Sequence, residues 1–174
     1  MDTVTRFLER RDALLTRLNE QLQEAEDAND AAWILCEYTG RELNLGDCVV
    51  YLPTTGDVLT QAAAWGPKRG IERLIESSLR LPIGRGIVGE CALLLQTQRV
   101  DDTREDPRYI QDDRPGLSEL SVPVRRDGTL LGVLDSEAAE TAFFDSRYEQ
   151  AFEAIAHCGA AHLWRLRNLA VVRR

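Results

Sequence analysis

Three acidic residues stand at the ends of two β-prone segments joined by a tight turn. Glu119 begins the first segment, and Asp135 and Glu137 end the second, with Asp127-Gly128 between the two. Asp-Gly is the strongest short hairpin signal, and antiparallel pairing brings the three carboxylates close together. Clustered carboxylates repel one another unless cations or protons neutralise them. Two interpretations stay open: the polar end of a pocket for an amine or another donor-rich ligand, or solvated acids that cap strand ends.

Three further residues are candidates for lining such a pocket. Trp65 and Tyr109 offer aromatic walls, although large aromatic side chains are also ordinary core residues, the favoured role for Trp65. Val88 lies in the first turn of a helix that is predicted to follow the turn containing Gly84 and Gly86. These glycines resemble a phosphate-binding loop but lack its full spacing and its lysine, so they indicate a tight strand-to-helix turn.

The residues that serve most often as nucleophiles or metal ligands form no convincing group. The two histidines are five residues apart on a predicted helix, a step that does not place them on one face. The four cysteines are widely scattered, without the close pairs of a zinc site, and free thiols in a reducing cytosol are expected. We predict no catalytic residue, no metal and no cofactor. The residues in question are Cys36, Cys48, Cys91, Cys158, His157 and His162.

Length and composition predict one cytoplasmic globular domain. The chain has 174 residues, of which 44% are hydrophobic and 29% charged, a normal balance for a soluble protein. The formal charge of −8 and the pI of about 4.9 repel nucleic acid and anionic membranes. The charged N-terminus does not resemble a signal peptide, and no window approaches the ~20 apolar residues of a membrane span.

Residues 1–30 are predicted to be an N-terminal helical segment. Residues 2–29 contain neither glycine nor proline, and apolar side chains that include Leu15 and Leu22 recur at alternating steps of three and four. The narrow stripe favours the seam of a coiled coil through which two copies pair. The alternative is an amphipathic helix that lies on its own domain.

The rest of the chain predicts an α/β fold of the α+β type. Helices on one side should cover an antiparallel sheet, with a pocket or loops on the other, because residues 130–134 are nearly all apolar and suit a strand buried on both faces. The predicted helices are residues 31–43, 68–78, 87–95 and 145–173. The predicted strands are residues 47–52, 58–64, 79–83, 99–102, 120–126 and 130–136, with a long loop at 103–118.

The order of these elements resembles the GAF domain family over residues 31–167. The resemblance rests on three segments: Leu81-Pro82-Ile83-Gly84-Arg85-Gly86-Ile87-Val88-Gly89, Asp106-Pro107-Arg108-Tyr109, and Ser118 to Val124 with Gly128 to Glu137. It implies a PAS/GAF-like sheet of about six antiparallel strands, with terminal helices on one face and a ligand pocket on the other. Residues 168–174 are then the end of the last helix or a linker.

The resemblance also implies a signalling role, in which a small polar ligand regulates a partner such as a kinase, a cyclase or another output domain. A structural dimerisation module without a ligand is the alternative. One GAF branch is similar to free methionine-R-sulfoxide reductases, which use cysteines beside the glycine turn and in the acidic loop. This chain has Val88 at the first place and Gln111-Asp112-Asp113 at the second. The acids of that branch nonetheless have counterparts in Glu119, Asp135 and Glu137, and we expect a sensor that is not an enzyme.

Overall fold

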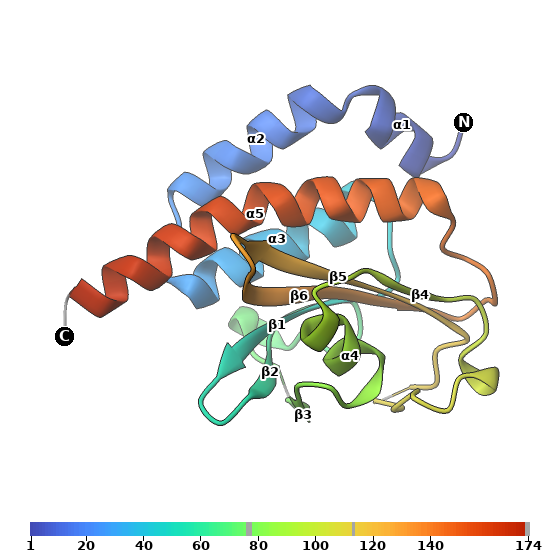
Figure 1. Cartoon of the computed structure of the whole chain (residues 1–174). Coiled ribbons are helices and arrows are strands. Elements are labelled where there is room, and N and C mark those ends of the chain that lie inside the picture. The colour runs from blue at the N-terminus through green and yellow to red at the C-terminus, as the bar shows by residue number, and fades with distance from the viewer. Residues whose placement is uncertain (76–77, 113, 173–174) are drawn as a thin grey trace.

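A six-stranded sheet forms the centre of the molecule, seen in the computed structural model, which describes residues 1–75, 78–112 and 114–172 (Figure 1). The strand order is β3-β2-β1-β6-β5-β4, and every neighbouring pair is antiparallel, as predicted. The strands are β1 (Cys48–Thr54), β2 (Val58–Trp65), β3 (Arg80–Pro82), β4 (Gln98–Val100), β5 (Ser118–Arg126) and β6 (Thr129–Ala138).

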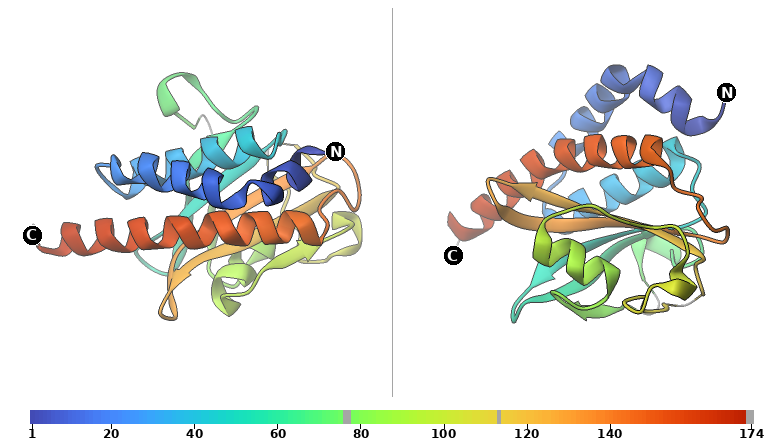
Figure 2. Two further views of the ribbon diagram at one scale, coloured as in Figure 1. Left: turned by 90° about the horizontal axis from the view of Figure 1, so that it is seen from above. Right: turned by 45° about the vertical axis from the view of Figure 1, so that its right-hand side comes forward.

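Helices cover the two faces of this sheet unequally. Helices α3 (Ala28–Glu42) and α5 (Ser146–Val172) lie on one face, and α1 (Thr3–Glu9) and α2 (Arg11–Gln23) pack on α5 (Figures 1 and 2). The opposite face carries the short α4 (Gly86–Leu94) and loops, which include the 3-10 turn Thr103–Glu105. The other 3-10 turn, Ile71–Arg73, lies beside α3, because Arg73 forms ion pairs with Asp30 and Glu37. The face covered by α3 and α5 is called the helix face below, and the opposite one the pocket face.

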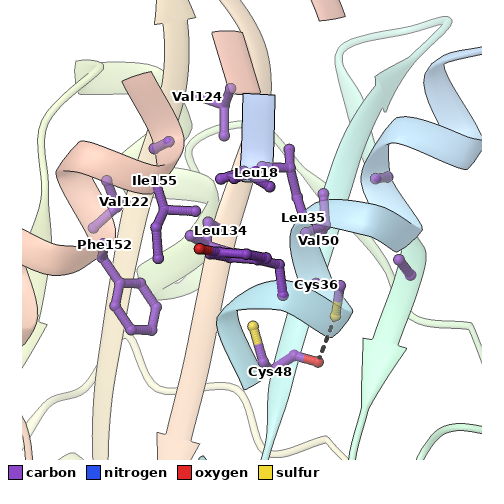
Figure 3. Packing of buried hydrophobic residues seen from close by; sticks show 14 of the residues in the cluster. Leu18, Leu35, Cys36, Cys48, Val50, Val122, Val124, Leu134, Phe152 and Ile155 are labelled. Atoms are coloured by element: carbon purple, nitrogen blue, oxygen red, sulfur yellow. Dashed lines mark hydrogen bonds between the residues drawn. The ribbon is translucent and has the colours of Figure 1, made fainter. Parts of the chain in front are cut away.

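The main hydrophobic core lies between the sheet and the helix face. Leu134 of β6 and Ile155 of α5 are almost completely buried there, together with Leu35 of α3 (Figure 3). The Cys36 thiol donates a hydrogen bond to the Cys48 carbonyl oxygen at 3.2 Å, which ties α3 to β1. Alternating apolar residues on β1, β5 and β6 supply this layer because successive side chains of a strand point to opposite faces.

Side-chain caps fix where the two covering helices begin. Asp27 accepts a hydrogen bond from the backbone N–H of Asp30 at 2.8 Å and starts α3, which satisfies a donor that has no partner within the helix. Asp145 accepts one from the backbone N–H of Arg147 at 2.9 Å at the start of α5. Both helices therefore begin within a few residues of the predicted positions.

The N-terminal segment differs from the single long helix predicted over residues 2–29. It turns at Arg10, where the backbone leaves helical geometry, and its second helix ends at Gln23. The turn lets the apolar side chains of both short helices reach the core, and Val4, Phe7 and Leu18 are at most 1% exposed. Burial of these side chains outweighs the modest gain of continuing one helix.

Several residues of the predicted coiled-coil stripe pack inside this chain. Leu18 and Leu22 are fully buried within the main core, and Asn19 contacts His162 of α5 at 2.8 Å between Oδ1 and Nε2. The Tyr38 hydroxyl donates to the Leu14 carbonyl oxygen at 2.6 Å and joins α3 to α2. Within this chain α2 therefore packs as an amphipathic helix on its own domain, and pairing of two copies stays a prediction.

The helix predicted over residues 68–78 is also absent from the described part of that segment. A 3-10 turn at Ile71–Arg73 takes its place, and the Gly70 N–H donates to the Leu74 carbonyl oxygen at 2.8 Å. Residues 76 and 77 lie outside the described residues. Among the described helices, none combines the length and the apolar character needed to cross a membrane.

Candidate functional site

The pairing of β5 with β6 brings the three predicted acids together. Glu119 lies directly opposite Glu137, and Ser121 opposite Asp135, so all four side chains leave the same side of the hairpin. The turn at Asp127 and Gly128, both with positive φ, sets this register. The prediction that the strand register gathers Glu119, Asp135 and Glu137 is confirmed.

The pocket face buries these carboxyl groups deeply. Glu119 is 4% exposed and Asp135 is 3% exposed, and the Ser121 hydroxyl donates to Asp135 Oδ1 at 2.5 Å. Burial, followed by repulsion from Glu137, raises the pKa of Asp135 to about 8. Burial also raises the pKa of Glu137 to about 7, and burial beside Asp135 holds the pKa of Glu119 well above its usual range. Protons therefore stay on part of this cluster near neutral pH.

Tyr109 joins the cluster from the long loop, as predicted. Its hydroxyl donates to Glu137 Oε2 at 2.9 Å and accepts a hydrogen bond from the Gly116 N–H at 2.8 Å. Gly116 lies so close to the Glu137 carboxylate that an added Cβ atom would overlap it. The loop thus reaches Glu137 with backbone as well as with an aromatic side chain, and only glycine leaves room for that approach.

Arg108 anchors the loop next to Tyr109. Its guanidinium donates two hydrogen bonds to Asp106, at 2.9 and 2.6 Å, and further bonds to Glu90 of α4 at 2.8 Å and Gln98 of β4 at 3.0 Å. A planar guanidinium suits such a forked arrangement. The Asp106 to Tyr109 segment therefore acts as a clamp that positions Tyr109 over the acids.

A buried ammonium group, which the sequence interpretation missed, faces the same cluster. Lys68 follows β2 and forms an ion pair with Asp112, and the two side chains are 10% and 12% exposed. Gln61 of β2 also donates to Asp112, at 2.6 Å, and to the Tyr51 hydroxyl at 3.0 Å. The charge of Lys68 acts against the rise in the pKa of Asp135. No short-range pattern links residues 61, 68 and 112, because three separate segments supply them.

Two cavities meet at this point. A small one of about 10 Å³ lies among the acids, Tyr51 and α4, and is comparable to the space of one water molecule. A larger open groove of about 460 Å³ lies beside it, lined by residues that include Lys68 and Pro115. Asp112 and Glu137 line both, so these two side chains form part of the wall between them.

Helix α4 forms the opposite wall of the small cavity. Val88, a predicted lining residue, is 4% exposed and lines it with Ile87. Gly84 and Gly86 have φ values of 87° and 75°, which L-residues rarely adopt, so the glycine turn has the structural role predicted for it. The turn brings the start of α4 back over the sheet.

Trp65 is separated from the other candidate lining residues. Its indole packs against Gly40 of α3, so closely that no Cβ fits there, and its N–H donates to the Leu45 carbonyl oxygen at 3.0 Å. Trp65 pairs with Cys48, whose side chain belongs to the main core. It therefore lies on the helix face, in the core role that was favoured for it.

Within the described part of the chain, no cysteine lines the small cavity or the groove. Cys91 of α4 is fully buried in the apolar cluster beneath the pocket face, and burial raises the pKa of its thiol above the ordinary range. Cys36 and Cys48 lie in the main core. All four cysteines are free. Asp113, the last residue of the loop segment compared with reductases, lies outside the described residues.

Comparison with solved structures shows the same fold in two kinds of protein. The free methionine-R-sulfoxide reductase of Neisseria meningitidis has a TM-score of 0.81 at 22% identity, over 97% of this chain and 95% of that one. The GAF domain of an Acinetobacter phosphoenolpyruvate-protein phosphotransferase has a TM-score of 0.76 at 17% identity, over 91% and 95%. At these identities the likeness extends to the fold alone.

Sequence comparison leads to the same family. Protein YtsP of Bacillus subtilis is 32% identical over 80 residues, which are 46% of this chain and 47% of YtsP, so the match spans about half of that relative. The family model of the GAF domain matches residues 25–163. That match covers the whole sheet, α3, α4 and much of α5, and it contains the whole acidic cluster. The chain belongs to the GAF domain family.

Proposed function

We propose that this GAF domain is a sensor that binds a small polar molecule through an ammonium group. One observation carries the proposal: Glu119, Asp135 and Glu137 share the pocket face, and the first two are almost fully buried. Burying carboxylates without a full set of counter-charges costs stability, and a cation that enters recovers part of that cost. Acids that only cap strand ends would stay in contact with water, and burial would then add no such cost.

The volume of the adjoining groove favours a ligand that is larger than a metal ion or a free ammonium ion. Its volume of about 460 Å³ falls within the range of small-molecule sites, and Glu137 gives it direct contact with the acids. Phe143 and Leu45 supply apolar lining, and Arg114 and Lys68 supply cations. We propose that the ammonium group binds among the acids while the rest of the ligand occupies the groove.

A free methionine-R-sulfoxide reductase is the second candidate, favoured by the shared fold with the Neisseria enzyme. That chemistry needs a reactive thiolate and a resolving thiol. Cys91 lies close enough to feel the charges of Asp135 and Glu119, and it is buried with a raised pKa. We propose that the domain carries out no turnover. A thiol-coupled assay on free methionine sulfoxide, with Cys91→Ala as the control, should give equal background rates for parent and variant. A rate that only the parent supports would establish the enzyme instead.

The terminal helices are proposed to transmit binding to a homodimer partner or to an output protein. Helix α5 contacts both β5 and α2, so a shift in the hairpin reaches the outer helices directly. Its C-terminal end projects past the sheet, and Leu169 there is 44% exposed (Figure 1). If this end pairs two copies, Leu169→Asp should shift the sedimentation coefficient toward that of a monomer. Equal sedimentation of parent and variant would remove this surface from the proposal.

A thermal-shift screen against amino acids and polyamines tests the ammonium site. A ligand at 100 times its Kd stabilises the folded state by about 2.7 kcal/mol, which raises the Tm by roughly 5 °C or more for a domain of this size. Asp135→Asn should reduce this shift, whereas Asp12→Asn, whose side chain is 93% exposed on α2, should leave it unchanged. Absence of any amine-dependent shift in the parent would contradict the proposal and favour a structural dimerisation module.

A further inference from the structure

Lys68 is unusual in both number and position. It is the single lysine among 21 basic residues, and its side chain is only 10% exposed. Lysine side chains normally keep their ammonium groups in water, because removing the charge from water is costly. A buried ammonium therefore requires partners, and here Asp112 is its direct one.

The backbone around Lys68 holds its side chain in this direction. Gly66 adopts a φ of 90° and approaches the Gly46 carbonyl so closely that no Cβ fits there. The Arg69 N–H donates to the Gly66 carbonyl oxygen at 3.1 Å and closes a turn around Pro67 and Lys68. The next residue, Arg69, points to Glu37 of α3 instead, at 2.8 Å. Two adjacent cations are thus aimed at different acids.

The Lys68 ammonium stands where the small cavity meets the groove. Its partner Asp112 lines both spaces, as does Glu137, while Lys68 itself lines the groove. The charge of Lys68 favours the ionised forms of Asp135 and Glu137. In chemical terms, the side chain presents a tethered n-butylammonium group to the acid cluster. The small cavity, at about 10 Å³, has no room for a second such group while the wall is closed.

We propose that Lys68 is a built-in substitute for the ligand: its ammonium group closes the acid pocket in the empty domain and must leave Asp112 when a ligand's ammonium group enters from the groove. This inference rests on the proposed function, because it assigns the same acids to an ammonium ligand. The exchange replaces one positive charge by another, so it selects for monocations of primary-amine type. The tethered group competes at a high effective concentration, which sets a threshold for sensing.

Chemical rescue tests the inference with n-butylammonium chloride as the probe. Lys68→Ala removes the tethered group and leaves its space, so the variant should bind n-butylammonium at least about tenfold more tightly than the parent. Lys68→Met keeps the volume of the side chain without its charge, and it should bind n-butylammonium less tightly than Lys68→Ala does. Arg69→Ala, which removes the adjacent cation, should bind as the parent does. Titration calorimetry at pH 7.5 and the rise in Tm with probe concentration are the readouts.

The outcomes separate this inference from the proposed function. Equal binding of n-butylammonium by the parent, Lys68→Ala and Lys68→Met overturns the role of Lys68 and leaves the ammonium site standing. No binding by any of the three, together with no amine-dependent shift in the parent, overturns both. If Lys68→Ala does not fold alone, refolding only with the probe present supports the inference. If Lys68→Ala folds neither with nor without the probe, and Lys68→Met binds the probe as the parent does, the inference is overturned.

Discussion

The two faces of the sheet carry different kinds of side chain, although the same strands contribute to both faces. On the helix face, Leu134 and Ile155 pack with other apolar side chains from α3 and α5. On the pocket face, Val133 is followed two residues later by the buried Asp135. Apolar packing stabilises the first face outright. The second face buries acidic side chains at the expense of stability, which is typical of functional sites.

The largest effect is expected on the helix face. Leu18→Ala removes a fully buried side chain of α2 from the main core and should lower the free energy of unfolding by about 3 kcal/mol. Leu93→Ala is the matched control, because that leucine is 61% exposed on α4, and its effect should stay within about 0.5 kcal/mol. Urea denaturation measures both. A small loss for Leu18→Ala would mean that α2 is not part of this core.

A smaller loss is expected where the backbone is crowded between strands. A Cβ atom at Gly132 of β6 would lie 2.8 Å from the Tyr51 carbonyl oxygen, so Gly132→Ala should cost about 2 kcal/mol. At Gly46 an added Cβ atom would meet nothing within 4 Å, and Gly46→Ala should be nearly neutral. Equal melting temperatures for the two variants would show that β1 and β6 can separate without penalty.

The smallest effect has the opposite sign and belongs to the pocket face. The pKa of Asp135 in the folded protein is about 8 and that of Glu137 about 7, both above the ~4 of an unfolded chain. The folded state therefore binds more protons, and stability falls as the pH rises through 7 and 8. Asp135→Asn should raise the free energy of unfolding by about 1 kcal/mol at pH 8.5 and flatten this pH dependence. Thermal melts from pH 6.5 to 8.5 measure this change in stability, with Asp12→Asn as the control. If Asp135→Asn is less stable than the parent at pH 8.5, Asp135 has a simple capping role.

The same contrast explains what the sequence could predict. The register of β5 and β6 followed from local chemistry, since Asp127-Gly128 permits the positive φ values of a tight hairpin turn. That register placed Glu119 opposite Glu137. Tyr109 and Val88 also joined the predicted site, through the loop clamp and the glycine turn.

Other features depend on contacts that no short pattern encodes. The turn at Arg10 arises because α1 and α2 both pack on α5, far away in sequence. Alternation along β2 does not predict the side on which Trp65 lies, because the register with β1 shifts between Val50 and Tyr51. The pair of Lys68 and Asp112 joins two loops and carries no periodic signal.

Carbon-13 NMR titration of the side-chain carboxyls is the most direct measurement of the pocket face. In the empty domain, the signals of Asp135 and Glu137 should titrate with midpoints near pH 8 and pH 7. A bound ammonium ligand should move both midpoints down, because a nearby cation favours the ionised carboxylates. Midpoints near pH 4 in the empty domain that no amine changes would contradict the claim that the buried acids of this face bind a cation.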